Sequence, residues 1–473
     1  MPGMTEAEKK PDARPASGDE LELDVESLAY GGNGVARTNG YVVFVRGGMP
    51  GDRVRARITK RKRSYAEATA EEVLEPSPDR VEPRVAHPGA PWQVLPYERQ
   101  LEEKQQQVVD ALERIGRFEA PPVAPILAAE QTLRYRNKVE YSFGEDGEAM
   151  ADAGEGSSEH GEIVLGFHHP GRWDRIDAIA EDVLASERVD GLRTAVADWC
   201  RAEGLSAYDR NDHSGFLRNL VVREGRRTAQ LEARLVTARG DFRAAELAAA
   251  VPTADSFLWT RSSSQGESSR DGQTEVVAGG EPLEELLEVG GRRLRFRISP
   301  EAFFQTNTEM AERLYEVAAE LAGLSGSERV FDLFSGIGTI ALALAGRAGE
   351  VWGIESSEDA VADAIANAQL NGIDNARFYA GDVRTALRPL VEQAGEADVA
   401  IVDPPRAGLS QKVVRRLLET RARRIVYVSC NPTTLAPNAR QIADAGYRLE
   451  AVAPVDMFPQ TPHIECVALL VRE

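Results

Sequence analysis

The pattern of apolar and polar residues divides the chain into three stretches with different periods. In residues 19–82, Leu21–Val25 and Arg53–Ile58 alternate between apolar and polar positions, and Tyr41–Val45 is a continuous apolar run. These patterns predict β-strands, and the glycine-rich segment Gly31–Gly34 predicts a tight turn between two of them. Several short strands in so few residues are typical of a small OB-type barrel, an architecture that often binds oligonucleotides.

The second stretch, residues 83–290, mixes helical and strand patterns and predicts an α+β domain. It also contains two segments with the composition of loops, 144–162 and 262–281. The first carries seven acidic residues and no Lys or Arg, as expected for a solvated insertion. Helical periodicity is found at 101–115, 184–202 and 244–250, and strand-like segments at 139–143, 163–167, 217–223 and 230–236.

The third stretch, residues 291–473, begins with a strand at 294–298 and then alternates strands with helices. This order is the pattern of a doubly wound, Rossmann-like α/β sheet. Thr306 and Glu309 stand at the spacing of a capping box, which predicts that Thr306 caps the first helix. Residues 1–18, by contrast, are polar and rich in Pro and Ala, and we expect a disordered tail there.

Charge changes this picture only locally. The chain has 56 Lys and Arg against 76 Asp and Glu, a net charge of −20, which argues against a general nucleic-acid coat protein. A local basic surface for one structured RNA is not excluded, because seven basic residues fall between Arg53 and Arg63. A solvated strand face explains such a run equally well. The acidic surplus could also be an adaptation to a salty cytoplasm.

Length and cysteine content indicate the class of protein. A chain of 473 residues is too long for one ordinary core, so several domains are expected. Three cysteines are too few and too scattered for a disulfide framework or a thiolate metal site. The longest apolar run is far too short to span a bilayer, and residues 1–20 have no signal-peptide core. We therefore expect a cytoplasmic protein that works as a monomer and has no membrane partner.

A nucleoside site is predicted where the third stretch begins its alternation. The strand Arg329–Phe334 leads through a Gly-x-Gly turn, Ser335–Thr339, into a helix, and Gly336 allows close backbone approach to a ligand. About 20 residues later the next strand ends at Glu355, a distance that suits the two hydroxyls of a ribose. The third glycine of dinucleotide-binding turns is missing, which favours a nucleoside without pyrophosphate, such as S-adenosylmethionine, over NAD or FAD.

Three further side chains that could take part in chemistry stand at the ends of later strands. Asp382 and Asp403 follow two successive strands; each alone could merely cap a helix, but together they favour a ligand crevice. Cys430 follows the apolar strand Ile425–Val428. Taken alone, it is more often a small buried hydrophobe than a nucleophile, although its place at a strand end is one where such sheets bind ligands.

Short phrases in the first stretch form a recognisable set: Leu28–Arg37, Phe44-Val45, Pro50–Val54, Pro76-Ser77 and Arg80-Val81. Together they cover most of residues 20–82 and resemble the TRAM domain. The resemblance implies RNA binding as an accessory function.

Four phrases follow in order along the third stretch: Phe304-Gln305-Thr306-Asn307, Asp403-Pro404-Pro405-Arg406, Ser429-Cys430-Asn431-Pro432 and Phe458-Pro459-Gln460-Thr461-Pro462-His463-Ile464-Glu465. With the TRAM phrases they resemble the RNA uridine-C5 methyltransferase family over nearly all of residues 20–473. The resemblance implies methyl transfer from S-adenosylmethionine to C5 of a specific uridine, through a covalent bond between Cys430 as nucleophile and C6, with Glu465 as general base. It also implies cofactor contacts, which with Gly336 of the turn are Gln305, Phe334, Glu355, Asp382 and Asp403.

The chemistry accounts for these residue types. C5 of uracil is a poor nucleophile towards a sulfonium methyl group, and a thiolate that adds at C6 makes C5 enolate-like. A cysteine can add and also leave again, but a general base must first remove the C5 proton. The target uridine must be unpaired or flipped out, because C6 cannot be reached within a stack.

The sequence indicates the target RNA less clearly than it indicates the reaction. The TRAM segment makes the chain resemble the ribosomal-RNA branch, so a uridine in 23S ribosomal RNA is the expected target. The same reaction on transfer RNA is an alternative, and a non-catalytic RNA-binding module is another. Candidate RNA contacts, which solvated faces would explain as well, are Arg55, Arg57, Lys60, Arg61, Arg134, Arg136 and Lys138.

One departure from the family pattern concerns a second cofactor. Many relatives hold an iron–sulfur cluster through cysteines ahead of the Trp-Gln phrase. Here Ala86–Gln93 contains no Cys, and Cys200 alone cannot hold a cluster. We therefore expect no iron–sulfur cluster.

Overall fold

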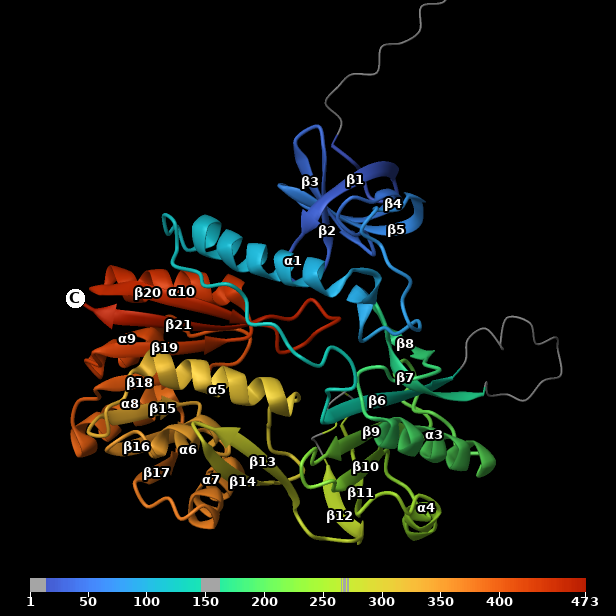
Figure 1. Ribbon diagram of the computed structural model, residues 1–473. Helices are drawn as coiled ribbons and strands as arrows, with labels where there is room; N and C mark the ends of the chain where they lie inside the picture. The colour runs from blue at the N-terminus through green and yellow to red at the C-terminus, as the bar shows by residue number, and fades with distance from the viewer. Residues whose placement is uncertain (1–13, 146–161, 265, 267–268, 270–271) are drawn as a thin grey trace, which may run out of the picture.

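The computed structural model describes residues 14–145, 162–264, 266, 269 and 272–473. The expected tail lies outside the described residues as far as residue 13, and so does 146–161 of the acidic insertion. The described chain forms an N-terminal barrel, a central sheet and a C-terminal sheet (Figure 1). No helix among the described residues is both long and apolar enough to cross a bilayer.

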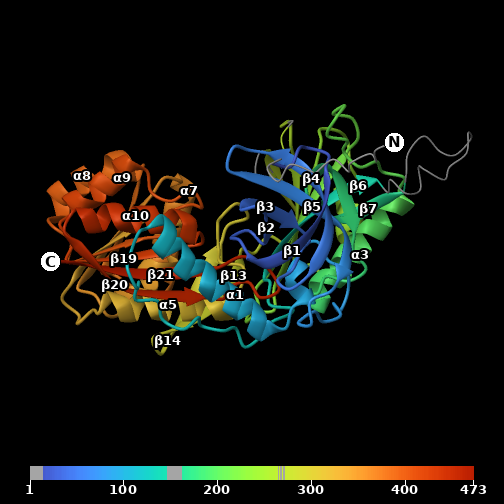
Figure 2. The same cartoon turned by 90° about the horizontal axis from the view of Figure 1, so that it is seen from above.

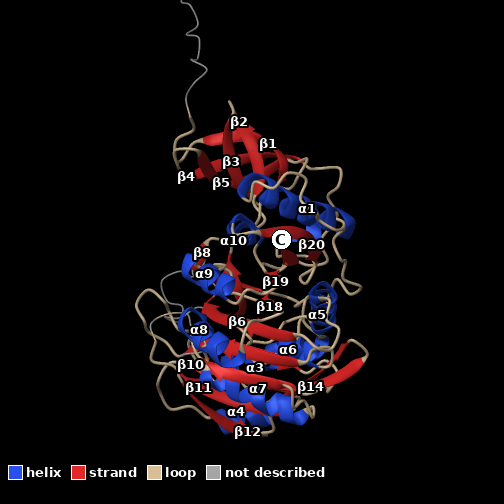
Figure 3. Ribbon diagram, turned by 90° about the vertical axis from the view of Figure 1, so that its left-hand side faces the viewer, coloured by secondary structure: helices blue, strands red, loops and turns tan. Residues whose placement is uncertain are grey.

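The N-terminal barrel is closed, with the strand order β1-β2-β3-β5-β4. Alternate side chains of its strands, among them Val25, Val43 and Ile58, pack into a core that belongs to the barrel alone. The barrel at the top of Figure 3 is built of strands, with one long helix beneath it. The OB-like barrel expected from the alternating pattern is confirmed. Its strands are β1 (Glu20–Leu28), β2 (Gly34–Thr38), β3 (Tyr41–Arg46), β4 (Arg53–Arg61) and β5 (Tyr65–Glu75).

The central domain is a seven-stranded sheet with the order β12-β11-β10-β9-β6-β7-β8, covered by two helices. One expectation was wrong here: the segment 262–281, expected to be a loop, contains a strand that pairs with β11 at the edge of the sheet. Its residues are almost all exposed, so they carry little of the apolar alternation by which a strand is recognised. The elements are β6 (Lys138–Glu145), β7 (Ile163–His169), β8 (Arg172–Ala178), α3 (Glu187–Ala202), β9 (Leu217–Glu224), β10 (Leu231–Thr237), α4 (Ala244–Ala250), β11 (Ser256–Arg261) and β12 (Gln273–Ala278).

The C-terminal domain is a doubly wound sheet with the order β17-β16-β15-β18-β19-β21-β20. Strands β15 to β19 run parallel, and β21 is inserted antiparallel between β19 and β20. Neighbouring residues such as Val330 and Phe331 face opposite sides, where α5 to α7 form one core layer and α8 to α10 the other. The elements are α5 (Thr308–Ala322), β15 (Arg329–Leu333), α6 (Thr339–Ala345), β16 (Glu350–Glu355), α7 (Glu358–Leu370), β17 (Ala376–Ala380), α8 (Val383–Ala394), β18 (Val399–Val402), α9 (Gln411–Glu419), β19 (Arg424–Ser429), α10 (Pro432–Asp444), β20 (Tyr447–Val455) and β21 (Glu465–Arg472).

Two pieces of chain that precede α5 pack on this C-terminal sheet. Helix α1 (Tyr97–Asp110) and the π-helical turn Ala111–Ile115 place Val108 and Leu112 in the core layer of α8 to α10. The helix runs from beneath the barrel towards the C-terminal sheet (Figures 1 and 2). On the opposite face, the hairpin β13 (Leu283–Val289) and β14 (Arg292–Ile298) packs against α5 and α7. The C-terminal domain is therefore buttressed on both faces by earlier parts of the chain.

The cap of α5 differs from the expected one. Asn307, not Thr306, is the N-cap: its backbone is extended and its Oδ1 accepts a hydrogen bond from the Met310 N–H at 3.2 Å. Its Nδ2 also donates to the Met457 carbonyl at 2.9 Å. Asn caps a helix at least as well as Thr, and the second bond to a distant backbone is what the local spacing could not reveal.

Candidate active site

The turn after β15 is shaped by residues with positive φ. Phe334, Gly336 and Gly338 all have left-handed backbones, with φ of 70°, 53° and 84°. At Gly338 any Cβ would lie 2.9 Å from the Phe378 ring, so both conformation and space require glycine. Glu355, at the end of β16, accepts a hydrogen bond from the Gly336 N–H at 3.1 Å. The Gly-x-Gly turn and the acid of the next strand therefore meet, as their spacing predicts.

A pocket opens beside this turn. Two buried polar atoms at its wall, Asp332 Oδ1 and Ser335 Oγ, have no hydrogen-bond partner among the described residues. Buried polar groups are normally paired, so these two atoms indicate a pocket made for a polar ligand. Its lining includes three of the predicted cofactor residues in addition to Gly336 of the turn: Gln305, Phe334 and Asp403.

Two carboxyl groups give the pocket its electrostatic character. Burial, with a contribution from the nearby Asp403, raises the pKa of Asp332 to about 7. Burial also raises the pKa of Asp403 to about 7. A cation placed beside them would lower both pKa values and be attracted in return. A nucleoside that carries a positively charged sulfonium group fits a pocket with these two carboxyl groups. Asp332 was missed by the sequence analysis, although an acid inside an apolar strand is a visible signal.

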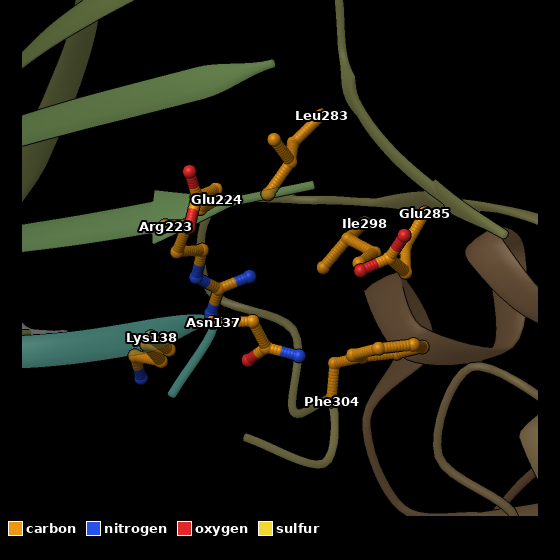
Figure 4. Close-up of a pocket in the computed structure, with 8 residues that line it drawn as sticks. All are labelled: Asn137, Lys138, Arg223, Glu224, Leu283, Glu285, Ile298 and Phe304. Atoms are coloured by element: carbon orange, nitrogen blue, oxygen red, sulfur yellow. The ribbon is translucent and has the colours of Figure 1, made fainter. Parts of the chain in front are cut away.

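The loop that carries Gln305 is held by the central domain (Figure 4). Asn137, at the start of β6, donates from Nδ2 to the Gln305 carbonyl at 2.9 Å and to Thr308 Oγ1 at 2.9 Å. Arg223 of β9 donates to the Ser299 carbonyl at 3.1 Å and to the Ala302 carbonyl at 2.6 Å. Figure 4 shows a second pocket, which also borders on Phe304, and there Asn137 points from the central sheet towards Phe304. The central domain thus fixes one wall of the pocket.

Asp382 lies near this pocket but does not line it. It is the N-cap of α8, and it forms an ion pair with Arg384. The hydrogen bond from Arg384 lowers the pKa of Asp382 to about 2. Its neighbour Gly381 donates to the Glu355 carbonyl at 2.7 Å, which places the Asp382 loop beside the end of β16. The structure therefore shows Asp382 as a helix cap, which is one of the two roles considered for it.

Cys430 and Glu465 come together at the same edge of the sheet. Strand β19 ends at Ser429, which pairs with Cys466 of β21, so Cys430 and Glu465 directly adjoin one paired position. The Cys430 side chain is half-buried, whereas Glu465 is only 4% exposed. Residues 35 apart in sequence thus reach one spot because β21 is inserted next to β19.

Burial perturbs both groups. It raises the pKa of Cys430 to about 11, with Glu465 adding to the effect and Arg406 opposing it. It also raises the pKa of Glu465 well above its usual range, with Asp403 adding and Arg406 again opposing. In the resting site Cys430 therefore holds its proton at neutral pH, and burial favours the protonated form of Glu465. Strongly perturbed titratable groups that meet in a crevice are typical of catalytic sites.

The loops around these two groups are tied to one another. Asn431 caps α10 by accepting a hydrogen bond from the Thr433 N–H at 3.0 Å, and Pro432 occupies the first helical turn, where it is well tolerated. The Asn431 Nδ2 also donates to the Arg406 carbonyl at 3.1 Å. The Asp-Pro-Pro-Arg loop and the cysteine loop consequently form one unit.

The loop that leads to Glu465 is anchored by a buried ion pair. Lys104 Nζ of α1 lies 2.6 Å from Asp456 Oδ1, and both side chains are fully buried. Lys104 also donates to the Phe458 carbonyl at 3.1 Å, and the Tyr97 hydroxyl donates to Asp456 at 2.8 Å. The sequence analysis missed Lys104, because a lone lysine in a polar helix gives no signal that it is buried.

The predicted RNA contacts are mostly paired with acids. On the barrel, Arg55 pairs with Glu72, Arg57 with Glu20 and Glu71, and Lys60 with Glu67. Arg61 is exposed at the end of β4. In the central domain Arg134 pairs with Glu181, Lys138 lies in β6, and Arg136 has a buried Nε without a hydrogen-bond partner among the described residues. These acids temper the local positive charge, and RNA contact by these residues stays a prediction.

The segment in which relatives carry cluster-binding cysteines is packed by other side chains. His87 Nε2 lies 3.1 Å from Asp182 Oδ1, and Trp92 is fully buried. Among the described residues no group of three or more His, Cys, Asp or Glu side chains could hold a metal ion. Cys200 is buried in the core of the central domain. The expected lack of an iron–sulfur cluster stays a prediction.

Comparison with known proteins agrees with this geometry. Residues 268–473 match the sequence model of the tRNA (uracil-5-)-methyltransferases, and residues 16–70 match the TRAM domain. An uncharacterized RNA methyltransferase of Porphyromonas gingivalis is 39% identical over 95% of this chain and 99% of its own. Another from Bacteroides thetaiotaomicron is 39% identical over 94% of this chain and 99% of its own.

A solved structure extends the match to three dimensions. The Pyrococcus abyssi tRNA (uracil-54, C5)-methyltransferase, in complex with S-adenosyl-L-homocysteine, is 28% identical and superposes with a TM-score of 0.74. The match covers 95% of this chain and 99% of that one, so barrel, central domain and C-terminal sheet are all included. The chain belongs to the RNA uracil-C5 methyltransferase family.

Proposed function

We propose that this protein methylates C5 of a uridine in 23S ribosomal RNA, with S-adenosylmethionine as methyl donor and Cys430 as nucleophile. The observation that carries the mechanism is the register of β19 and β21, which brings the half-exposed Cys430 thiol and the buried Glu465 carboxyl to adjoining positions. One group can attack uracil, and the other can take a proton from it.

The pocket beside β15 would hold the cofactor. Glu355 would bind the ribose hydroxyls, and the backbone of Gly336 would lie against the nucleoside. Gln305, Phe334 and Asp403, which line the pocket, would position the rest of the molecule. When bound, S-adenosylmethionine supplies an electrophilic methyl group on a sulfonium sulfur. Asp382 would contribute from the neighbouring loop, where it caps α8.

Addition is the first step. The Cys430 thiol loses its proton to solvent, and the thiolate forms a bond to C6 of a flipped-out uracil, so that the electron pair of the C5–C6 double bond moves to the enolate. C5 then bonds to the methyl carbon, and the electron pair of the broken bond stays on the donor sulfur. The pKa of about 11 means that thiolate formation is costly at neutral pH. Arg406 lowers that cost because its positive charge favours the thiolate.

Elimination completes the reaction. Glu465 in its ionised form removes the proton from C5, the C5–C6 double bond forms again, and the thiolate leaves C6. The burial that raises the Glu465 pKa also makes its carboxylate a stronger base once the substrate has excluded water. The products are 5-methyluridine and a regenerated Cys430.

Trapping with 5-fluorouridine RNA tests this mechanism. Fluorine at C5 cannot be removed as a proton, so methyl transfer should leave RNA covalently attached to the protein. We expect an adduct that requires S-adenosylmethionine, maps to Cys430 by mass spectrometry, and disappears in Cys430→Ala. Cys466→Ala is the matched control, because its thiol lies one residue from Glu465 yet is fully buried. An adduct that survives Cys430→Ala would overturn the mechanism.

Glu465→Gln tests the second half of the reaction on ordinary RNA. The amide cannot take the C5 proton, so methylated RNA should remain attached to Cys430 and the release rate should fall by at least about a hundredfold. Release at the normal rate would assign the base role to another group.

Transfer RNA is the second candidate substrate. It is favoured by the superposition with the Pyrococcus abyssi enzyme, whose target is a tRNA uridine. The ribosomal target is supported by the resemblance to the ribosomal branch, whereas the barrel does not separate the two because the match to the Pyrococcus abyssi enzyme includes it. Mapping 5-methyluridine in both RNA classes from a deletion strain, with and without the restored gene, separates the two. Loss of the modification from transfer RNA alone would exclude 23S ribosomal RNA.

A further inference from the structure

The turn between β1 and β2 of the barrel reaches the cysteine loop of the C-terminal domain. The Tyr30 hydroxyl donates a hydrogen bond to the Cys430 carbonyl at 3.0 Å, across 400 residues of sequence. Figure 1 shows the barrel above the C-terminal sheet, with helix α1 between most of the two bodies. Tyr30 therefore connects the accessory barrel directly to the residue that carries the nucleophile.

Several contacts fix the position of this turn. Gly32, with φ of +89°, lies so close to the neighbouring loop that a Cβ there would be 2.9 Å from Pro462 Cβ and 3.3 Å from the Trp92 indole nitrogen. Just before the turn, the Leu28 N–H donates to Glu103 of α1 at 3.2 Å, within the apolar cluster formed by Leu28, Met49, Trp92 and Leu95. Pro462 belongs to the loop that ends at Glu465. The turn is thus packed against both reactive loops and is not a free arm.

The Cys430 carbonyl needs a donor from outside its own element. The ladder between β19 and β21 ends with the pair Ser429 and Cys466. Helix α10 begins at Pro432 with Asn431 as its N-cap, so the carbonyl of Cys430 precedes the first acceptors of the helix. The contact is partly buried, so the carbonyl is paired either by a side chain, which fixes its peptide plane, or by water, which leaves that plane freer to rotate. Rotation of that plane would move the Cα–Cβ bond that aims the thiol.

The charges around Tyr30 keep its hydroxyl a donor. Burial raises the pKa of Tyr30 to about 12, and the Cys430 and Glu465 groups add to this effect, while Arg406 opposes it. The phenol is therefore protonated at every pH at which the enzyme would work.

We propose that Tyr30 is a positioning residue for methyl transfer, whose hydrogen bond to the Cys430 carbonyl holds the nucleophile in its attacking orientation. The barrel then completes the active site in addition to binding RNA. The chemistry would then depend on the barrel being in place. The inference rests on the proposed role of Cys430.

The test compares Tyr30→Phe with Tyr65→Phe. Both substitutions remove one hydroxyl from the same barrel, but the Tyr65 ring packs against Phe44 of β3. Single-turnover methylation is measured at saturating labelled S-adenosylmethionine and saturating 23S ribosomal RNA transcript, or tRNA transcript if that is the RNA methylated. We expect the Tyr30→Phe rate to fall about threefold to tenfold, since one hydrogen bond is lost. The dissociation constant for RNA should stay within about twofold, because the ring and its packing remain.

Tyr30→Ala removes the ring as well and should lower the single-turnover rate by about a hundredfold, as expected when a reacting group is displaced by about 1 Å. Compared with Tyr30→Ala, Tyr30→Phe should recover most of the RNA affinity but not the full methylation rate. A purely structural role would not separate affinity from rate in this way. Equal single-turnover rates for Tyr30→Phe and the wild type would overturn the proposal. So would a rate loss explained entirely by weaker RNA binding.

Failure of the proposed function and failure of the Tyr30 inference give different experimental results. If wild-type protein forms no adduct with 5-fluorouridine RNA, the role of Cys430 falls and Tyr30 has no nucleophile to position. If wild type forms the adduct and Tyr30→Phe forms it at the same rate, only the inference about Tyr30 is wrong.

Discussion

The proposed cofactor pocket beside β15 and the proposed nucleophile pocket around Cys430 share one edge of one sheet, but they are assembled in different ways. The cofactor pocket is built mainly from a local run of chain, the β15–turn–α6 unit with Glu355 at the end of the next strand. The nucleophile pocket combines Tyr30 of the barrel, Cys430, and Glu465 in a loop anchored through Lys104 of α1. A local unit can be replaced or reshaped without disturbing remote parts, whereas the nucleophile pocket depends on the correct docking of every domain.

The difference teaches where precision comes from. A cofactor that is the same for many enzymes can be bound by a portable strand–turn–helix unit. Attack on C6 requires a thiol, a base and a flipped base to be placed together, and misplacement by about 1 Å can cost a hundredfold in rate. Distant parts of the chain supply that rigidity. Four substitutions or conditions should affect the two pockets differently, with expected effects that decrease from the first to the fourth.

Lys104→Met should have the largest effect. It leaves Asp456 buried without its cation, and breaking a buried ion pair in this way costs about 3–5 kcal/mol of unfolding free energy. The exposed barrel pair offers a matched control, because Arg55→Gln breaks an ion pair with Glu72 that is worth at most about 1 kcal/mol. Urea unfolding measures both variants. Equal losses would mean that the Lys104 pair does not anchor the Glu465 loop.

The pH dependence of Cys430 alkylation should be the next largest effect. Only the thiolate reacts, and with a pKa of about 11 the thiolate fraction rises with pH throughout the range below that value. The iodoacetamide rate should therefore increase about tenfold for each unit from pH 7 to pH 9, or about a hundredfold in all. Mass spectrometry identifies the labelled residue, and Cys430→Ala supplies the background. A rate that levels off near pH 8.5 would indicate an unperturbed thiol.

Asn137→Ala should damage the cofactor pocket alone. The loop that carries Gln305 loses two hydrogen bonds, and we expect about a tenfold loss of affinity for S-adenosylhomocysteine by calorimetry. Alkylation of Cys430 should be unchanged. Asn375→Ala is the control, since its side chain donates to three backbone carbonyls, at 2.9, 3.1 and 3.5 Å, but near the start of β17 and outside the pocket lining. A matching loss of affinity in Asn375→Ala would contradict the assignment.

Arg406→Gln should have the smallest effect and act on the nucleophile pocket. Arg406 lowers the pKa of both Cys430 and Glu465, so its removal should raise both values further and slow alkylation at pH 8. Because Arg406 is exposed and screened, about a twofold change is expected, and 1 M salt should abolish it. Arg415→Gln on α9 removes an exposed charge elsewhere as the control. A faster rate in Arg406→Gln would reverse the sign of this electrostatic effect.

The sequence predicted the local unit better than the assembled one. The barrel, the strand–helix alternation and the meeting of Gly336 with Glu355 follow from periodicity and spacing, because those contacts are made within one unit. The cap at Asn307 was missed in favour of Thr306, since its second hydrogen bond goes to Met457, far along the chain. Strand β12 was missed because its residues are exposed on both faces.

Lys104 and Tyr30, whose roles depend on a distant partner, could not be identified from the sequence. Lys104 looks like any solvated lysine until Asp456 is known to lie against it. Tyr30 sits in a phrase that predicts a turn, and nothing near it indicates contact with Cys430. Asp382 is a different case. The sequence left open whether it contacts the ligand or caps a helix, and its capping contact and its ion pair with Arg384 are both local. Pairings between remote segments are what pattern analysis of one sequence cannot supply.

The insertion of β21 between β19 and β20 has a consequence for biosynthesis. Both neighbours are made before β21, so until it emerges from the ribosome each exposes an unpaired edge, and such edges invite aggregation. The barrel, by contrast, has its own core and can fold as soon as it is complete. The nascent protein should therefore be able to recruit RNA before it can react, and the catalytic domain should depend on chaperones during the interval.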